Sequence, residues 1–264
     1  MIVKNRHFIV PLSVIAFLAG IGSAVCAGVG AGPRVTPEIV RMGIRYGGAL
    51  LRVEGVKAPD AQVVVMVRGE AGEEMFNKVG RVGPIWGITG KVTVTNTPSL
   101  LLVFSSAPLS NCLPRAAIDR YGLDQRAIAK QTRVESKAAD YDRIAEDYWR
   151  YKIRQGNYQL VNGTVQTGPA GADGTPYTVE FTMPKTAAPG QYTIGVLECY
   201  GGEIVRATEL PLRVVEVGFP ALVTWLATQH ASGYGIMAVV VAMLAGFGID
   251  FLAARLFKNT IGGH

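Results

Sequence analysis

The chain has 264 residues, of which 49% are hydrophobic and 17% charged, a composition too apolar and too varied for a disordered protein. Its net charge of +6 falls to about +3 when the charged residues near the two chain ends are set aside. So small an excess does not indicate a nucleic-acid-binding protein, and it allows only a mild attraction for anions or acidic lipids.

A signal peptide is predicted at residues 1–27. Lys4 and Arg6 form a basic start, residues 8–21 form a short apolar stretch, and the small residues up to Ala27 suit cleavage. An uncleaved N-terminal anchor is the alternative. A lipoprotein is less favoured, because the residues before Cys26 do not match a lipoprotein signal. We therefore expect the following domain to be exported.

A first β-rich region is expected over residues 28–113. Apolar and β-branched runs bounded by turn residues predict strands at 38–45, 49–56, 62–69, 91–97 and 99–106. In one of them Val63, Val65 and Val67 alternate with the equally apolar Val64 and Met66. This strand is therefore expected to be buried on both faces, as part of a β-sandwich.

A helical segment is expected over residues 114–156, where the apolar period changes from 2 to about 3.6. Pro114 and Asp124 are predicted helix starts, and Gly156 a stop. One predicted helix face consists of Tyr141, Ile144, Ala145, Tyr148 and Trp149. The favoured interpretation is an amphipathic helix packed on the sheet. The alternative is a basic aromatic surface for an anionic partner, made with Arg143, Arg150, Lys152 and Arg154.

A second β region is expected over residues 157–217. Its stretch PKTAAPGQYTIGVLE is similar to the Pro-Gly turn and following strand of immunoglobulin-like sandwiches. Gly190 would permit the turn, and Tyr192, Ile194 and Val196 would face one layer. The predicted fold is mainly β: exported immunoglobulin-like β-sandwich regions with a helical insert, followed by one transmembrane helix. One elongated domain and two small domains both remain open.

The C-terminal part is predicted to reach and cross a membrane. Residues 218–233 form a juxtamembrane segment, either a short interfacial helix or a plain linker, and 234–257 a transmembrane helix. The apolar run from Gly235 to Leu256 contains only two charged residues and has about the 20 residues that cross a bilayer as a helix. Arg255 and Lys258 lie at the end of this run, and basic residues favour the cytoplasmic side of a span. Residues 258–264 are therefore expected to be a cytoplasmic tail. The body of the chain is expected in the periplasm, anchored to the inner membrane.

Catalytic chemistry is not expected. The histidines are His7, His230 and His264, and none lies in the body of the exported domain. A histidine-based nucleophile system is thereby excluded there, and the commonest metal ligand is missing. No catalytic, cofactor or metal site is predicted. Cys112 and Cys199 are a possible disulfide in an oxidising compartment, and two separate buried thiols are the alternative.

The predicted span carries a small-residue stripe. Ala238, Ala242 and Gly246 recur every four residues and would let another helix approach closely. Asp250 continues this possible helix-packing face. Its carboxylate either reaches water at the cytoplasmic end or meets a polar group on a neighbouring helix.

The order of several segments carries a resemblance: VVVMVRG, VGPIWGITG, YWRYKIRQGNYQ and YGIMAVVVAMLAG. Over residues 38–257 the chain resembles the family of putative transmembrane proteins first described from alphaproteobacteria. The resemblance implies an exported single-span protein, often encoded beside permeases of the TauE/SafE sulfite exporter type. It implies a partner, not a chemistry, and no catalytic residue is carried over from it.

The expected function is a non-enzymatic accessory or interaction subunit of such a small-anion export permease. The alternative is a membrane-anchored periplasmic ligand-binding or sensing module. An accessory subunit should expose an apolar patch near the membrane, whereas a binding module should have a pocket with convergent polar groups.

Overall fold

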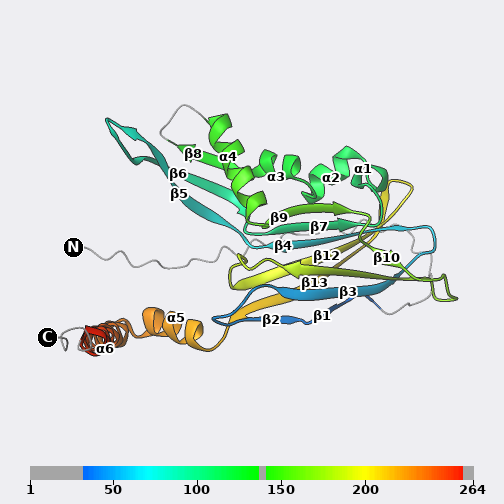
Figure 1. The fold of residues 1–264 in the computed structure, drawn as a ribbon. Coiled ribbons are helices and arrows are strands. Elements are labelled where there is room, and N and C mark those ends of the chain that lie inside the picture. Colours follow the sequence, from blue (N-terminus) through cyan, green and yellow to red (C-terminus); the bar gives the residue numbers. More distant parts are fainter. Residues whose placement is uncertain (1–31, 137–140, 258–264) are drawn as a thin grey trace.

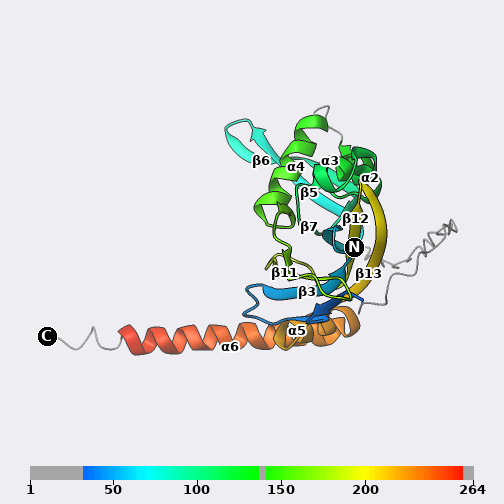
Figure 2. The same ribbon diagram turned by 90° about the vertical axis from the view of Figure 1, so that its right-hand side faces the viewer.

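A computed structural model describes residues 32–136 and 141–257 (Figures 1 and 2). It is mainly β, with several sheets, a group of helices and one apolar C-terminal helix, which confirms the predicted fold class. An immunoglobulin-like strand arrangement is not specifically confirmed. The predicted signal peptide and cytoplasmic tail lie outside the described residues.

Two sheets form a sandwich. One is antiparallel, with the strand order β1 (Arg34–Thr36), β3 (Ala49–Lys57), β11 (Thr175–Met183) and β10 (Gln166–Thr167). The other has the order β2 (Ile39–Met42), β13 (Glu203–Glu216), β12 (Gly190–Tyr200), β4 (Gln62–Gly69), β7 (Leu101–Ser105) and β9 (Tyr158–Asn162). Strands from both predicted β regions pair within each sheet, so the two regions build one sandwich.

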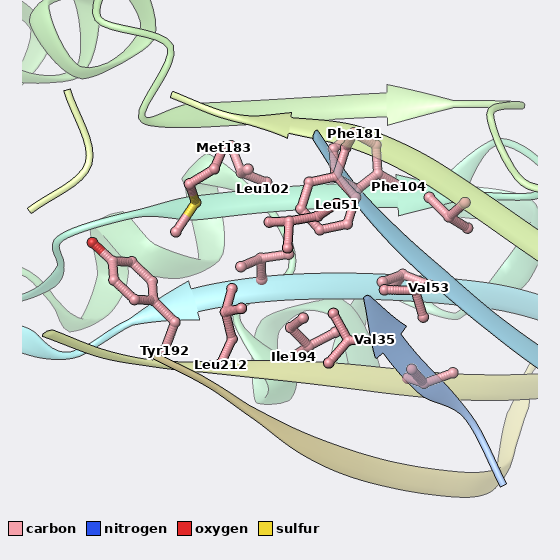
Figure 3. Close-up of a cluster of buried hydrophobic side chains, with 14 of the residues drawn as sticks. Val35, Leu51, Val53, Leu102, Phe104, Phe181, Met183, Tyr192, Ile194 and Leu212 are labelled. Carbon is pink, nitrogen blue, oxygen red and sulfur yellow. The ribbon is translucent and has the colours of Figure 1, made fainter. Parts of the chain in front are cut away.

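The main core lies between the two sheets (Figure 3). Alternate residues of β3 and β11 point toward the larger sheet, where Ile194 and Leu212 are fully buried. The Phe104 and Phe181 rings stack across the gap with centroids 4.9 Å apart. Burying one large apolar side chain contributes about 1.5–3 kcal/mol, so this layer is the largest source of stability.

The six-stranded sheet also buries its other face. Val63, Val65 and Val67 belong to the main core, while Val64 and Met66 belong to a second cluster beneath the helices. The two-sided burial predicted for β4 is confirmed. In Figure 1 the helices cover this second face: α1 (Leu109–Cys112), α2 (Arg115–Tyr121), α3 (Gln125–Gln131) and α4 (Tyr141–Arg154).

Local sequence explains where these helices begin and end. Pro114 and Asp124 are the N-cap residues of α2 and α3, as predicted. Gly122 ends α2 in a left-handed conformation, φ 61°, which glycine adopts without steric cost. Tyr148 and Trp149 of α4 are buried against the sheet. The amphipathic helix is therefore confirmed, and Lys152 is buried rather than part of a basic surface.

A long ribbon projects from the sandwich in Figure 1. It consists of β5 (Ala71–Val82) and β6 (Ile85–Pro98), and the short β8 (Arg133–Ser136) pairs with the base of β6. The prediction of a strand only at 91–97 missed most of this hairpin. The reason is physical: the outer half of the ribbon is exposed on both faces, so it lacks the apolar–polar alternation of a half-buried strand.

Two helices end the described chain. After β13, only Val217 and Gly218 precede α5 (Phe219–Gln229), and α6 (Ala231–Phe257) follows. Figure 2 shows α6 leaving the body as a single rod.

Candidate functional site

The first candidate surface is α5. Gly218, with φ 70°, turns the chain from β13 into this helix, and Thr224 Oγ1 donates a hydrogen bond of 2.7 Å to Glu216 Oε2 across the turn. Phe219, Leu222 and Trp225 are exposed. A short helix thus occupies the predicted juxtamembrane segment and leaves apolar and aromatic side chains uncovered.

The second candidate surface is α6. Residues Ser232–Arg255 are long and apolar enough to cross a membrane, with a mean hydropathy of 2.3, and none of the most apolar stretch is buried within the protein. Ala238, Ala242, Gly246 and Asp250, the predicted helix-packing face, are all exposed. Apart from its chain neighbours and the backbone of the helix itself, no atom of the described chain lies within 4 Å of where a Cβ on Gly246 would stand. The face is therefore free to meet lipid or another helix.

Cys112 and Cys199 lie in one apolar cluster beneath the helices. Both are buried free thiols in the structure. Burial, and secondarily the nearby Cys112, raise the pKa of Cys199 to about 12, and burial also raises the pKa of Cys112. The structure brings the two residues of the predicted disulfide into the same core, and their pairing stays a prediction.

A groove that the sequence did not reveal lies between α4 and the β5–β6 ribbon. It has a volume of about 440 Å³ and an apolar lining that includes Val79, Val92 and Ile144. Phe76 contacts the Tyr148 and Tyr151 rings edge-on, with centroids 5.6 and 5.5 Å away. Arg143 and Asp147 also line the groove. This arrangement suits an apolar group with a small polar end.

A buried polar cluster joins α4 to the base of the ribbon. Lys152, only 3% exposed, forms an ion pair with Glu74 and donates a 3.2 Å hydrogen bond to the Ser99 carbonyl. Its ammonium group also lies 5.7 Å and 5.5 Å from the ring centroids of Tyr148 and Tyr158. A buried charge with an opposite charge and aromatic faces around it is stabilised. This cluster therefore holds α4 in place.

A threonine completes this cluster. The Thr97 hydroxyl lies 3.1 Å from the Tyr148 hydroxyl and 2.7 Å from that of Tyr158, and Tyr158 donates to the Pro98 carbonyl at 2.6 Å. Burial raises the pKa of Tyr158 to about 12 and holds the pKa of Tyr148 still higher. Both phenols are therefore neutral hydrogen-bonding groups at physiological pH.

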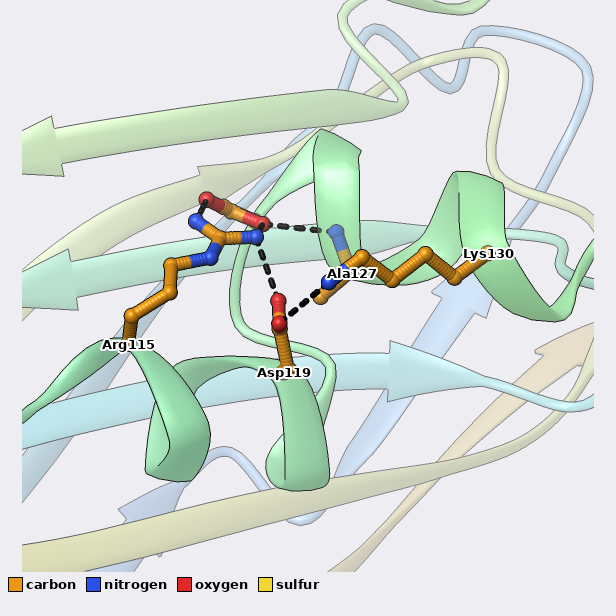
Figure 4. Close-up of polar contacts among 5 residues, drawn as sticks. Arg115, Asp119, Ala127 and Lys130 are labelled. Carbon is orange, nitrogen blue, oxygen red and sulfur yellow. Dashed lines mark hydrogen bonds and ion pairs between the residues drawn. The ribbon is translucent and has the colours of Figure 1, made fainter.

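An exposed ionic cluster links α2 and α3 (Figure 4). Arg115 bonds both Asp119 and Asp124, and Lys130 bonds Asp119. Asp124 also accepts a 2.8 Å hydrogen bond from the Ala127 N–H as the N-cap of α3. Lys130, and then Arg115, lower the pKa of Asp119. Every charge has a partner, so the cluster is best explained as a structural clamp.

No group of three or more His, Cys, Asp or Glu side chains is placed to hold a metal ion within residues 32–136 and 141–257.

Comparison with known proteins identifies a family and nothing more specific. The family model described as putative transmembrane protein (Alph_Pro_TM) matches residues 32–255, nearly all of the described chain. Neither the curated proteins nor the solved structures gave a match.

Proposed function

The chain belongs to the Alph_Pro_TM family of putative transmembrane proteins, and we propose that it is an accessory or interaction subunit of a membrane transporter. The supporting observation is α6, an apolar helix whose exposed surface combines a small-residue face with one carboxylate, Asp250. The partner we propose is a permease of the TauE/SafE type, which would export a small anion such as sulfite.

The chemistry of a bilayer supports a protein partner for this face. Lipid chains do not distinguish one order of apolar residues from another, so an anchor alone needs no small-residue stripe. Helices associate in lipid by close van der Waals packing and interhelical hydrogen bonds, and both favour small residues and polar groups at the contact. Ala238, Ala242 and Gly246 would permit the approach, and Asp250 would provide the polar contact.

The proposed orientation places the sandwich in the periplasm and the C-terminus in the cytoplasm, with α6 in the inner membrane. Arg255 at the end of the span supports it, because basic residues flank the cytoplasmic ends of spans. Alkaline phosphatase fused after Gly201 should be active, and fused after His264 inactive. The reverse pattern would contradict this orientation.

The partner hypothesis is tested by two substitutions in α6 that both keep the helix apolar. Gly246→Leu adds bulk to the small-residue face, while Val240→Leu adds one methylene on another face. Co-purification of the permease in mild detergent should fall strongly for Gly246→Leu and stay unchanged for Val240→Leu. Equal recovery with the two variants would leave α6 as an anchor only.

A second candidate function rests on the groove beside α4. Its volume of about 440 Å³ lies within the range of small-molecule sites, about 300–1,000 Å³, and its apolar lining favours a ligand with an apolar body. Native mass spectrometry of the full chain in detergent should then detect a co-purified small molecule. Val79→Trp, at an exposed position on the lining, should displace that molecule without disturbing the core.

A further inference from the structure

The tip of the β5–β6 ribbon exposes large apolar side chains. Ile85, Trp86 and Ile88 of β6 and Val79 of β5 are all more than half exposed. Trp86 is 74% exposed, as much as Phe247 of the membrane-spanning helix at 73%. Such exposure of four large apolar side chains at the end of one hairpin is unusual for a surface that faces only water.

The tip is also positively charged. The residues between Glu74 and Asp119 include no carboxylate side chain, while the exposed Arg81 and Lys91 lie in the outer part of the ribbon. Arg81 pairs with Trp86 in the strand ladder. Basic side chains beside tryptophan and aliphatic side chains match a membrane interface, where rings lie at head-group depth and cations attract anionic lipids.

The tip lies on the side of the domain from which α6 leaves. In Figure 2 α6 extends to the left, and the end of the ribbon is at the left edge of the body. A second exposed apolar residue, Ile44, follows β2 beside the start of α5, where the Val217 N–H donates to the Met42 carbonyl at 2.9 Å. Arg45 is its exposed neighbour. The β5–β6 tip and the Ile44–Arg45 turn are thus two separate places where exposed apolar and basic side chains lie near the side of the domain from which α6 leaves.

We propose that the β5–β6 tip is a second membrane contact, which inserts Ile85, Trp86 and Ile88 at head-group depth and pairs Arg81 and Lys91 with anionic lipid phosphates. The bilayer is the occupant that this chemistry favours, because the tip joins the surface that α6 already brings to the membrane. The proposal requires α6 to anchor the chain and is independent of any permease.

The test uses the full chain reconstituted in vesicles that contain no other protein. Trp225→Phe removes the tryptophan of α5, and Trp149 is buried, so the exposed emission comes from Trp86. Lipids brominated near the head group should quench this emission in vesicles of phosphatidylcholine with phosphatidylglycerol. Quenching should weaken in Arg81→Gln/Lys91→Gln and in pure phosphatidylcholine.

A matched control places tryptophan elsewhere. Tyr200, 59% exposed, lies at the end of the β12–β13 hairpin away from α5. Tyr200→Trp in a Trp86→Phe/Trp225→Phe background should therefore show no quenching. Trp86 emission that is identical in brominated and unbrominated vesicles of both compositions would overturn the lipid contact. A partner protein would then be the better occupant of the tip.

Discussion

The two faces of the six-stranded sheet are buried by different means. One face is covered by a second sheet, and the layer between them is built from alternating aliphatic and aromatic side chains. The other face is covered by short helices and a ribbon, and it buries Lys152, Thr97 and two cysteines among its apolar residues. Two sheets can pack face to face when the apolar residues alternate along the strands of both. Short helices and a ribbon have no such regular surface, so specific polar contacts are needed to fix their positions.

Truncation within the sheet-covered face should have the largest effect. Leu51→Ala removes a side chain with no exposed surface and should lower the free energy of unfolding by about 2–5 kcal/mol. Leu50→Ala, on the same strand but 62% exposed, is the control and should change little. Urea unfolding of the full chain in detergent, followed by tryptophan emission, measures both. An equal decrease in the free energy of unfolding for Leu51→Ala and Leu50→Ala would contradict the placement of Leu51 in the main core.

On the helix-covered face, the cysteines provide the next largest effect. If Cys112 and Cys199 form a disulfide, the long loop that it closes should contribute about 4 kcal/mol to stability in the chain-entropy model. Cys199→Ser should then lower the melting temperature of oxidised protein much more than that of reduced protein.

Thiol alkylation gives an independent readout of the same pair. It must be done in denaturant without reductant, because buried thiols with raised pKa values hardly react in the native state and would imitate a disulfide. Modification of both Cys112 and Cys199, located by peptide mass spectrometry, would rule the bond out.

Breaking the polar cluster should have an intermediate effect. Lys152→Met leaves Glu74 without its cation and the Ser99 carbonyl without its donor, which should cost about 1–3 kcal/mol. Arg150→Met removes an exposed pair with Glu146 and should cost at most about 0.5 kcal/mol. The same urea experiment compares them. A smaller loss for Lys152→Met than for Arg150→Met would show that the buried cluster does not hold α4.

The exposed clamp between α2 and α3 should have the smallest effect, and that effect should depend on pH. Because the pKa of Asp119 is lower in the folded chain, its contribution is present above the unfolded pKa of about 3.9 and disappears as the pH falls through the folded value. Asp119→Asn should therefore reduce the free energy of unfolding slightly at neutral pH. On acidification the variant should lose less of its stability than the parent protein does. Parallel stability curves for the variant and the parent would contradict this pH dependence.

Predictability from sequence differs between the two faces. Apolar residues at both the odd and the even positions of β4 predicted that both of its faces are buried. Pro114 and Asp124 marked helix starts. Both kinds of signal could be recognised because they depend only on residues close together in the sequence. The Lys152–Glu74 pair joins residues 78 positions apart, and on an amphipathic helix such a lysine resembles a solvated one. The groove beside α4 depends on the same long-range contact, and the ribbon that forms its other wall has no alternation to recognise.

The short connection between β13 and α5 limits the reach of the sandwich. Only Val217 and Gly218 lie between these elements, and the Val217 N–H is tied to the Met42 carbonyl. With α6 in a bilayer, the domain is held at a nearly constant height and explores the membrane plane by lateral diffusion alone. Once α6 is bound to a neighbouring span, a short tether of this kind gives the sandwich an effective concentration on the order of millimolar toward that neighbour, so even a weak contact between the two would be well populated.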